Sequence, residues 1–300
     1  MRILISGASG FIGSALADKL TSSGHRVIRL TRQPVSHGQD AVHWDPTKGC
    51  LDAADLEGID GVVHLAGEGI GDHRWTDGHK ARVLDSRVRG TKLLAETIAG
   101  LIDPPSVMIS GSAVGYYGYE SGDREFTEED PPGRGFLAKV VEQWEVSSAP
   151  AQRAGIRVVR TRSGVVLGPQ GGALRRQLLP FKLGLGGNMA SGRQYLSWIT
   201  LADQVRAMEF LLERDDISGP VNLTSPQPVT NARFTRALGA ALGRPTFMPV
   251  PSIAINLMFS SEMATEMIFG GQKVLPKRLQ DAGFEFRDPD IESTLRRMLG

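Results

Sequence analysis

Cysteine is almost missing from this sequence, which has one, Cys50, in 300 residues. A single cysteine excludes a disulfide within the chain, and one thiol without neighbouring metal ligands does not make a thiolate zinc site. Among the six histidines only His73 and His79 lie close together, and they lack the spacing of ligands on one helix face. We therefore expect no metal site, and the cysteine usage favours a cytoplasmic protein.

The sequence also lacks an excess of charge of either sign and a long apolar run. Its 34 basic and 33 acidic residues leave a formal net charge of +1 at pH 7, which provides no basic footprint for nucleic acid or anionic lipid. No run of about 18 apolar residues occurs, and no basic segment followed by an apolar stretch opens the chain. We expect a small-molecule substrate, no nucleic-acid partner, no membrane span and no export signal.

Glycine, by contrast, is abundant, at 36 of 300 residues against a usual share of roughly 7%. The first half of the chain alternates short β-branched or aliphatic runs with longer helical patterns, which is typical of a parallel sheet with helices on both faces. Strands are predicted at residues 2–6, 26–30, 41–43, 61–65, 106–110 and 157–162, and helices at 11–23, 76–100 and 136–154. The predicted fold class is α/β, a Rossmann-type doubly wound parallel sheet with a smaller C-terminal α/β substrate region.

The pattern changes after residue 168, where glycines break the chain into loops and short elements. Residues 203–214 then form a clear helical pattern, and residues from about 250 to 300 are expected to form a helical unit with a strand-like stretch at 284–286. Because 300 residues exceed the usual size of a single core, we predict a nucleotide-binding domain at 1–168 and a substrate-side region at 169–300.

A glycine-rich loop joins the first predicted strand to the first predicted helix. In Gly7-Ala8-Ser9-Gly10-Phe11-Ile12-Gly13, Gly7 allows a tight turn, Gly10 lets the backbone approach a pyrophosphate, and Gly13 permits close packing of helix on strand. The N-terminus of the helix then holds the negative charge. The predicted cofactor contacts of this loop are Gly7, Ser9, Gly10, Phe11, Ile12 and Gly13. A purely structural glycine loop is the alternative.

The end of the second strand indicates which dinucleotide binds. An acid about 20 residues after the glycine loop would contact the ribose of NAD, whereas an arginine would accommodate the 2′-phosphate of NADP. The residues there are Thr31 and Arg32, with no acid. Arg32 can pair with a phosphate in bidentate fashion and Thr31 can donate its hydroxyl. We predict NADP (NADPH) as cofactor, with NAD the weaker candidate; a solvated arginine at a strand end is the alternative.

Further motifs carry a family resemblance. His64-Leu65-Ala66-Gly67 and Gly90-Thr91-Lys92-Leu93-Leu94, with the glycine loop, resemble the extended short-chain dehydrogenase/reductases and nucleotide-sugar epimerases. Other segments look like an atypical epimerase-like subgroup, labelled a cell-division-inhibitor homologue, whose C-terminal domain has no known function. They include Arg74-Trp75-Thr76, Tyr116-Tyr117-Gly118, Trp144-Glu145, Arg162-Ser163-Gly164, Ser197-Trp198-Ile199 and Ala282-Gly283-Phe284. The resemblance spans nearly the whole chain and implies that Leu65, Ala66 and Gly67 pass beside the cofactor.

The resemblance also implies a catalytic group with one member missing. In these enzymes a tyrosine, a lysine four residues later and a serine act on the substrate oxygen, and the lysine also holds the nicotinamide ribose. The pattern assigns the serine to Ser112 and the lysine to Lys139. The residue four before Lys139 is Gly135, which has no acid to offer, so ordinary carbonyl reduction by tyrosine is in doubt.

Other residues are candidates for the missing role. Tyr116 and Tyr117 follow Ser112 on the loop where ligands bind, and Tyr117 is the first choice, with packing as the alternative. Glu68 directly follows the H-x-A-G turn and would act as a base if desolvated, or it is an ordinary solvated acid. Arg87 stands where extended relatives carry an asparagine and holds either a substrate anion or a helix–loop contact.

Trp198 is a candidate for the apolar wall of a substrate site, because tryptophan offers a large flat face, although most tryptophans only pack. Two functions compete. One is an NADP(H)-dependent oxidoreductase or epimerase acting on a small or sugar-like substrate, with Ser112 polarising the oxygen. The other is a non-catalytic dinucleotide-binding redox sensor, which would explain Gly135. A shared fold does not decide between them. The chain is expected to be a monomer or a homodimer.

Overall fold

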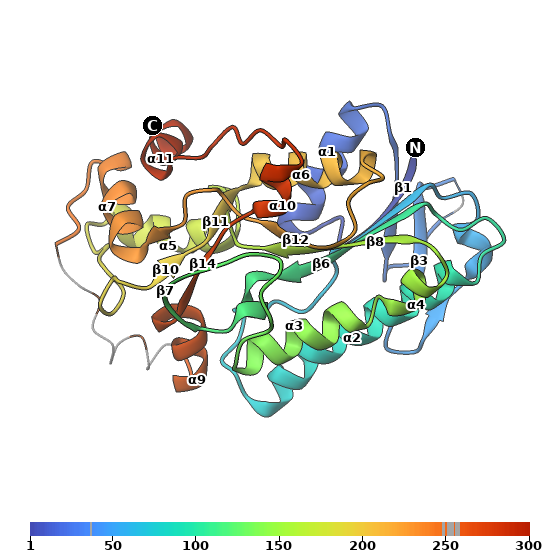
Figure 1. The fold of residues 1–300 in the computed structure, drawn as a ribbon, viewed down its shortest axis with the longest axis horizontal. Coiled ribbons are helices and arrows are strands. Elements are labelled where there is room, and N and C mark those ends of the chain that lie inside the picture. Colours follow the sequence, from blue (N-terminus) through green and yellow to red (C-terminus); the bar gives the residue numbers. More distant parts are fainter. Residues whose placement is uncertain (37, 248–249, 251–254, 256–258) are drawn as a thin grey trace.

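The centre of the molecule is an eight-stranded sheet in the order β12-β8-β6-β5-β1-β2-β3-β4 (Figure 1). The computed structural model describes residues 1–300 except 37, 248–249, 251–254 and 256–258. The parallel strands are β1 (Arg2–Ser6), β2 (Arg26–Thr31), β3 (Ala41–Asp45), β5 (Gly61–His64), β6 (Val107–Ala113), β8 (Arg157–Ser163) and β12 (Gly219–Leu223), and β4 (Cys50–Leu51) pairs antiparallel with β3. The predicted doubly wound α/β fold is confirmed.

Helices cover both faces of this sheet (Figure 1). One face carries α1 (Phe11–Ser22) and α6 (Leu201–Glu213), and the other carries α2 (Asp77–Ala99), α3 (Phe136–Val146) and α4 (Ala149–Arg153). Strand β1 serves both layers, because Ile3 and Ile5 join the core cluster under α1 and α6 while Leu4 joins the cluster under α2. This alternation is the two-residue period of a strand, and burial on both faces explains why the strands read as continuous apolar runs.

Most predicted elements agree with the structure within a few residues. The helix expected at 136–154 is divided into α3 and α4, and Pro150 lies in the first turn of α4, where a proline is tolerated because its missing N–H would have no partner. The strand expected at 106–110 continues to Ala113. The strand-like stretch at 284–286 is not a strand: Phe284 lies in an irregular segment and packs its ring on Phe210 and Phe286.

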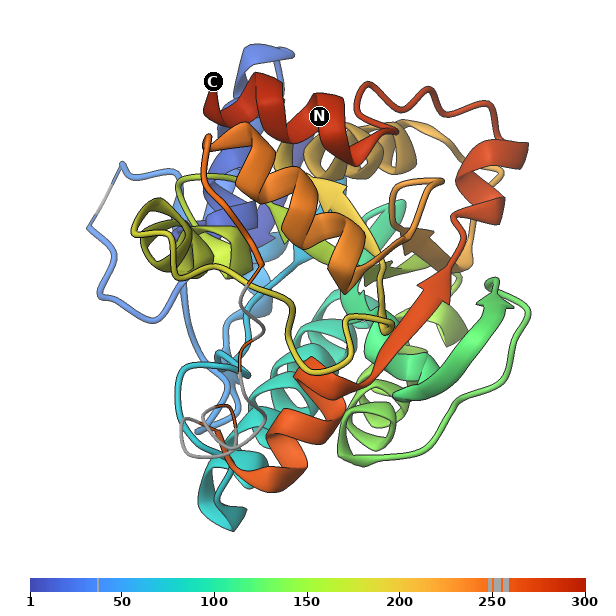
Figure 2. The same cartoon turned by 90° about the vertical axis from the view of Figure 1, so that its left-hand side faces the viewer.

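The second half of the chain adds to the same sheet. Strand β12 pairs with β8, and α6 packs on α1, so the sheet continues beyond the boundary expected at residue 168. The other elements of this half form a lobe beside it, seen face-on in Figure 2. They are β9 (Val165–Leu167), α5 (Gly172–Lys182), β10 (Tyr195–Leu196), β11 (Trp198–Thr200), β13 (Val229–Thr230) and α7 (Asn231–Ala241).

The C-terminal segment is more mixed than the helical unit expected from about 250. It contains α9 (Ser261–Ala264), a π-helical turn η3 (Thr265–Phe269), β14 (Gly271–Val274), α10 (Lys277–Asp281) and α11 (Ile291–Leu299). Residues 251–254 and 256–258 of that unit lie outside the described residues. Strand β14 pairs in parallel with β7 (Glu120–Phe126). The sequence patterns did not indicate β7, β12 or β14, which are short or rich in polar residues.

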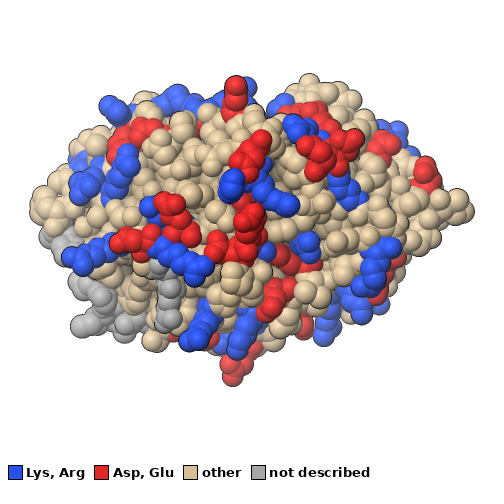
Figure 3. All heavy atoms as spheres, in the orientation of Figure 1, with Lys and Arg blue, Asp and Glu red and all other residues tan. Residues whose placement is uncertain are grey.

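Two surface properties bear on function. On the face shown in Figure 3, basic and acidic side chains are interspersed, in keeping with the small net charge. In the described parts of the chain, each helix is too short or too polar to cross a membrane.

Candidate cofactor and active site

The strand order reverses between β1 and β5. From β1 the chain proceeds outward to β2 and β3, and then returns to β5 and proceeds the other way through β6, β8 and β12. Open α/β sheets bind ligands at such a switch point, outside the carboxyl ends of the strands. The glycine loop follows β1, the H-x-A-G turn follows β5, and Ser112 is near the end of β6. The predicted site residues of these three strands therefore lie at one edge.

The glycine loop is packed tightly against the turn after β5. A Cβ atom on Gly7, whose φ is +70°, would lie 2.9 Å from the backbone nitrogen of Ala66, and one on Gly13 would lie 2.1 Å from the carbonyl oxygen of Gly7. Helix α1 begins after Gly10; none of the described side chains caps it, and its first turn contains no acid. The free N–H groups of this helix end thus suit an anion such as a pyrophosphate.

His64 is a structural residue of the H-x-A-G turn. Its Nδ1 lies 2.6 Å from Ser6 Oγ. Ser6 Oγ accepts hydrogen bonds from the backbone N–H groups of Leu65 and Ala66. Because these two bonds occupy its lone pairs, the Ser6 hydroxyl donates its proton to Nδ1. Burial, with a contribution from the charge of Arg87, lowers the pKa of His64 to about 4, so the ring is neutral at pH 7. This hydrogen bond fixes the turn on which the predicted contacts Leu65, Ala66 and Gly67 lie.

Arg32 directly follows β2 and is exposed. Its guanidinium makes no hydrogen bond or ion pair with any residue that the structure describes, whereas Arg26 at the start of the same strand is paired with Asp40 at 2.6 Å. Thr31 Oγ1 accepts a hydrogen bond from the backbone N–H of Gln33. Arg32 is thus available to bind a phosphate.

Glu68 and Arg87 fix the loop after β5 to helix α2. Arg87 donates from one guanidinium nitrogen to the carbonyl oxygens of Glu68 and Val83, at 2.9 and 3.0 Å, and the Glu68 backbone N–H donates to Ser86 Oγ. Of the two roles expected for Arg87, the helix–loop contact is therefore present in the structure. Burial lowers the pKa of Arg87 to about 10, partly offset by Glu68.

The Glu68 carboxylate is 37% exposed, and within the described ranges it has basic side chains nearby but accepts no hydrogen bond. Its oxygen lies 3.8 Å from Arg82 Nε and 4.0 Å from His79 Nδ1. His79 is buried, and neither of its ring nitrogens has a hydrogen-bond partner among the described residues. The sequence suggested no role for His79, because a single histidine on a helix carries no recognisable pattern.

Ser112 belongs to a buried polar network. Its hydroxyl donates to Glu145 Oε1 at 2.6 Å, and Arg162 donates to both carboxylate oxygens of Glu145, at 2.7 and 2.9 Å. The pKa of Arg162 is raised, because Glu145 and Tyr117 outweigh the lowering effect of burial. A hydroxyl has one proton, and that of Ser112 is bonded to Glu145. In this geometry Ser112 presents lone pairs, so the expected polarisation of a substrate oxygen requires the hydroxyl to turn away from Glu145.

Tyr117 belongs to the same hydrogen-bond network, to which Arg162 connects it. Its hydroxyl donates to Asn222 Oδ1 at 2.7 Å and accepts from Arg162 at 3.0 Å, and the residue is 3% exposed. Burial raises the pKa of Tyr117 to about 12, against the opposing effect of Arg162. This geometry does not support the choice of Tyr117 as proton donor, because a buried and fully bonded phenol cannot reach a ligand. Packing, the alternative, agrees with it.

A carboxylate from the C-terminal segment lies against Gly135 and leaves no space for a side chain there. Glu266 accepts hydrogen bonds from the backbone N–H groups of Phe136 and Leu137, at 2.7 and 2.9 Å, and so caps α3. A Cβ atom on Gly135, whose φ is +112°, would lie 2.7 Å from Glu266 Oε1. Lys139, one turn further along α3, is exposed, and its side-chain ammonium makes no hydrogen bond or ion pair in the described part of the chain.

Trp198 does not form the wall of an open site. The side chain is fully buried in the core cluster of the second lobe, and Nε1 donates to the carbonyl oxygen of Gln227 at 3.0 Å. The Ser197-Trp198-Ile199 motif is thus a packing motif here, because β11 pairs with β9 and turns the indole inward. Periodicity alone could not distinguish a buried indole from one that faces a ligand.

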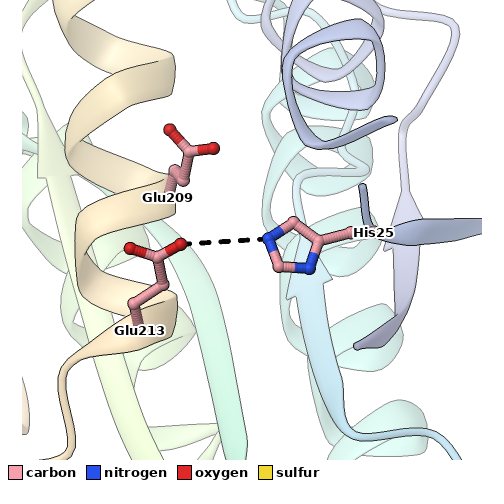
Figure 4. Close-up of side chains that lie close together, drawn as sticks. All are labelled: His25, Glu209 and Glu213. Carbon is pink, nitrogen blue, oxygen red and sulfur yellow. Dashed lines mark ion pairs between the residues drawn. The ribbon is translucent and has the colours of Figure 1, made fainter. Parts of the chain in front are cut away.

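One group of potential metal ligands occurs among the described residues, at the opposite end of the sheet (Figure 4). His25 precedes β2, and Glu209 and Glu213 lie near the end of α6, with His25 Nε2 3.9 Å from Glu213. Glu209 is already paired with Lys19 at 2.7 Å and accepts a hydrogen bond from Ser23. These bonds explain the cluster as an ion-pair network that joins α1 to α6.

The switch point, the uncapped α1 and the turn after β5 define a protein with an NAD(P)-binding fold of the epimerase type. The chain belongs to the NAD dependent epimerase/dehydratase family, whose model matches residues 3–223, and the Domain of unknown function (DUF1731) matches residues 250–298. The resemblance stated from the sequence is thereby confirmed.

Similar proteins cover the whole chain. Epimerase family protein Mb2239 of Mycobacterium bovis is 44% identical over 98% of this chain and 96% of its own, and human epimerase family protein SDR39U1 is 37% identical over 100% of both. A crystal structure of human SDR39U1 (isoform 2) with NADPH has a TM-score of 0.92 at 37% identity, covering 100% of this chain and 99% of that one. The similarity therefore includes the C-terminal segment.

Proposed function

We propose that this protein binds NADP(H) across the switch point and acts as an epimerase-like oxidoreductase on a small or sugar-like substrate. The observation that carries the cofactor assignment is that, among the residues that the structure describes, the α1 N-terminus has no side-chain cap and the Arg32 guanidinium has no partner. The α1 N-terminus suits the pyrophosphate and exposed Arg32 suits the 2′-phosphate of the adenosine ribose. The similar human protein that was crystallised with NADPH supports this proposal.

The residues around the site have separate tasks in this proposal. Gly7, Gly10 and Gly13 admit the dinucleotide backbone, Leu65, Ala66 and Gly67 line its path, and a bound nicotinamide supplies or accepts a hydride. Glu68 is the partly exposed carboxylate at the end of β5 and would hold or accept a proton beside the substrate. Arg87 keeps the Glu68 loop in place through its bonds to backbone carbonyl oxygens.

A non-catalytic dinucleotide sensor is the second candidate, and one observation favours it. The serine proton is bonded to Glu145, and Glu266 lies against the position of the usual tyrosine. Both features reduce the number of groups that are free to exchange a proton with a substrate. Turnover of a carbonyl or alcohol substrate would exclude this candidate.

The cofactor proposal is tested by titrating the protein with NADPH and NADH. We expect NADPH to bind more tightly, and Arg32→Ala to weaken NADPH binding by about tenfold or more while leaving NADH binding unchanged, because a charge-assisted bond contributes about 1.5–3 kcal/mol. Arg29→Ala is the matched control, since Arg29 is also exposed and lies on the same strand. Equal affinities for the two dinucleotides, or equal effects of the two substitutions, would refute the assignment to NADP.

A further inference from the structure

Three of the groups first expected to act on the substrate oxygen are engaged elsewhere or absent, which leaves Glu68 as a partly exposed carboxylate that can accept a proton. The Tyr117 hydroxyl is buried and bonded to Asn222 and Arg162, the Ser112 proton is bonded to Glu145, and position 135 is a glycine. A reductase or epimerase of this family nevertheless needs a group that gives a proton to, or takes one from, the substrate oxygen. A proton donor must therefore come from another residue at the carboxyl edge of the sheet.

Tyr116 has the position and the freedom that Tyr117 lacks. It lies in η2 (Val114–Tyr117), the single turn that follows β6, four residues after Ser112. Strand β6 pairs in parallel with β5, so this turn and the H-x-A-G turn both follow the carboxyl ends of neighbouring strands. Tyr116 is half-buried, and its hydroxyl makes no hydrogen bond with any described residue. The phenol thus remains available to a ligand.

A buried cation holds the ring of Tyr116. The guanidinium carbon of Arg162 lies 3.4 Å from the centroid of this ring. The ring of Tyr117 packs edge-on against the ring of Tyr116, with 5.4 Å between the two centroids. Arg162 is in turn held by both carboxylate oxygens of Glu145. A cation on the face of a phenol is attracted to its electron-rich ring. Arg162 would therefore orient the ring of Tyr116.

We propose that Tyr116 is the proton-transferring catalytic residue of this site, in place of the tyrosine that is missing at position 135. The inference rests on the proposed NADP(H)-dependent function. In carbonyl reduction, the O–H bond of Tyr116 breaks and its proton joins the substrate oxygen, while the substrate carbon gains a hydride from the reduced nicotinamide dinucleotide and the C=O bond becomes C–O. Water then returns a proton to the phenolate. Alcohol oxidation follows the same steps in reverse.

The first test compares three tyrosine variants in a carbonyl-substrate screen with NADPH. We expect Tyr116→Phe to lower kcat by about 100-fold or more, the usual contribution of a general acid, with unchanged NADPH affinity. Tyr119→Phe is the matched control, because Tyr119 is also half-buried and its hydroxyl has no hydrogen-bond partner in the described ranges. Tyr117→Phe is expected to lower the free energy of unfolding and to have a smaller effect on kcat than Tyr116→Phe. Full turnover by Tyr116→Phe, or a comparable loss in Tyr119→Phe, would overturn the inference.

The second test does not depend on turnover. Tetranitromethane nitrates accessible phenols, and it would be applied to a Cys50→Ser background because the one cysteine is exposed. We expect saturating NADP⁺ to abolish nitration of Tyr116 and to leave that of Tyr195 unchanged, as located by mass spectrometry. Nitration of Tyr116 that NADP⁺ does not affect would overturn the inference. A wild-type protein without turnover but with this protection would refute the oxidoreductase proposal and support the position of Tyr116 at the cofactor.

Discussion

Gly135 shows how one residue position can be closed to a side chain by a distant part of the chain. Its φ of +112° is unfavourable for any residue with a Cβ atom, and the carboxylate of Glu266 occupies the space where that atom would lie. Glu266 is 7% exposed and bonded to the first turn of α3. A side chain at this position would therefore collide with Glu266, so that introducing a tyrosine alone would not give the usual geometry of that residue.

The first prediction concerns this position. We expect Gly135→Ala to lower the free energy of unfolding by about 2–3 kcal/mol, because backbone strain and collision with Glu266 act together. Gly155→Ala is the matched control, since Gly155 has a φ of +86° but no atom within 4 Å of its Cβ position; its expected cost is about 1 kcal/mol. Urea denaturation measures both. Equal costs would show that Glu266 does not occupy the space beside Gly135.

Among the elements, β5 ends on a buried histidine whose pKa is strongly lowered. His64, the last residue of β5, is buried and has a pKa of about 4 in the folded protein, below the usual value of about 6.5 in an unfolded chain. As the pH falls from about 6.5 to 4, the unfolded state takes up a proton that the folded state does not. The stability that neutral His64 contributes is present above pH 6.5 and is lost across this interval.

The corresponding prediction is a pH-dependent loss of stability. Between pH 7 and pH 4.5, His64 is expected to account for a fall of about 2–3 kcal/mol in the free energy of unfolding. Urea denaturation of wild type and His64→Asn at both pH values measures the contribution of His64 to this fall in the free energy of unfolding, because asparagine does not titrate. His43→Asn, at an exposed position of β3, is the control. If wild type and His64→Asn lost the same stability on acidification, the buried neutral histidine would not be the cause.

At the scale of the whole molecule, the C-terminal segment is integrated with the nucleotide-binding sheet. Leu279 and Phe284 belong to the same core cluster as Ile3 and Ile5 of β1. Glu266 caps α3, and β14 pairs with β7. The segment that matches the Domain of unknown function (DUF1731) therefore supports both the main core and the edge of the sheet where the candidate site lies.

This integration predicts one cooperative unfolding transition. We expect Leu279→Ala to lower the free energy of unfolding by about 2–5 kcal/mol, as for other buried leucines, in a single transition observed by both fluorescence and circular dichroism. Ile102→Ala removes an apolar side chain that is 96% exposed and is expected to change stability by less than about 0.5 kcal/mol. Separate transitions in Leu279→Ala would show that the C-terminal segment unfolds independently.

Sequence patterns alone were enough to predict the parallel sheet, its first helix and the glycine loop. These features depend on local pattern: apolar runs give strands, helical spacing gives helices, and glycines after a strand give a tight loop before a helix. Arg32 could likewise be located at a strand end because strand and helix lengths fix its distance from the loop. The family resemblance added Ser112, Lys139 and the absence of tyrosine at position 135.

Which of these side chains can meet a ligand depends on packing between distant parts of the chain. Whether Ser112 donates to Glu145, whether Trp198 is inside, and whether Tyr116 or Tyr117 has an unbonded hydroxyl all depend on residues far away in the chain. Glu266 accepts a hydrogen bond from the backbone N–H of Phe136, which lies 130 residues earlier in the chain. Such contacts leave no periodic signal, because hydrogen-bond partners and burial are set by packing between elements rather than by spacing within one.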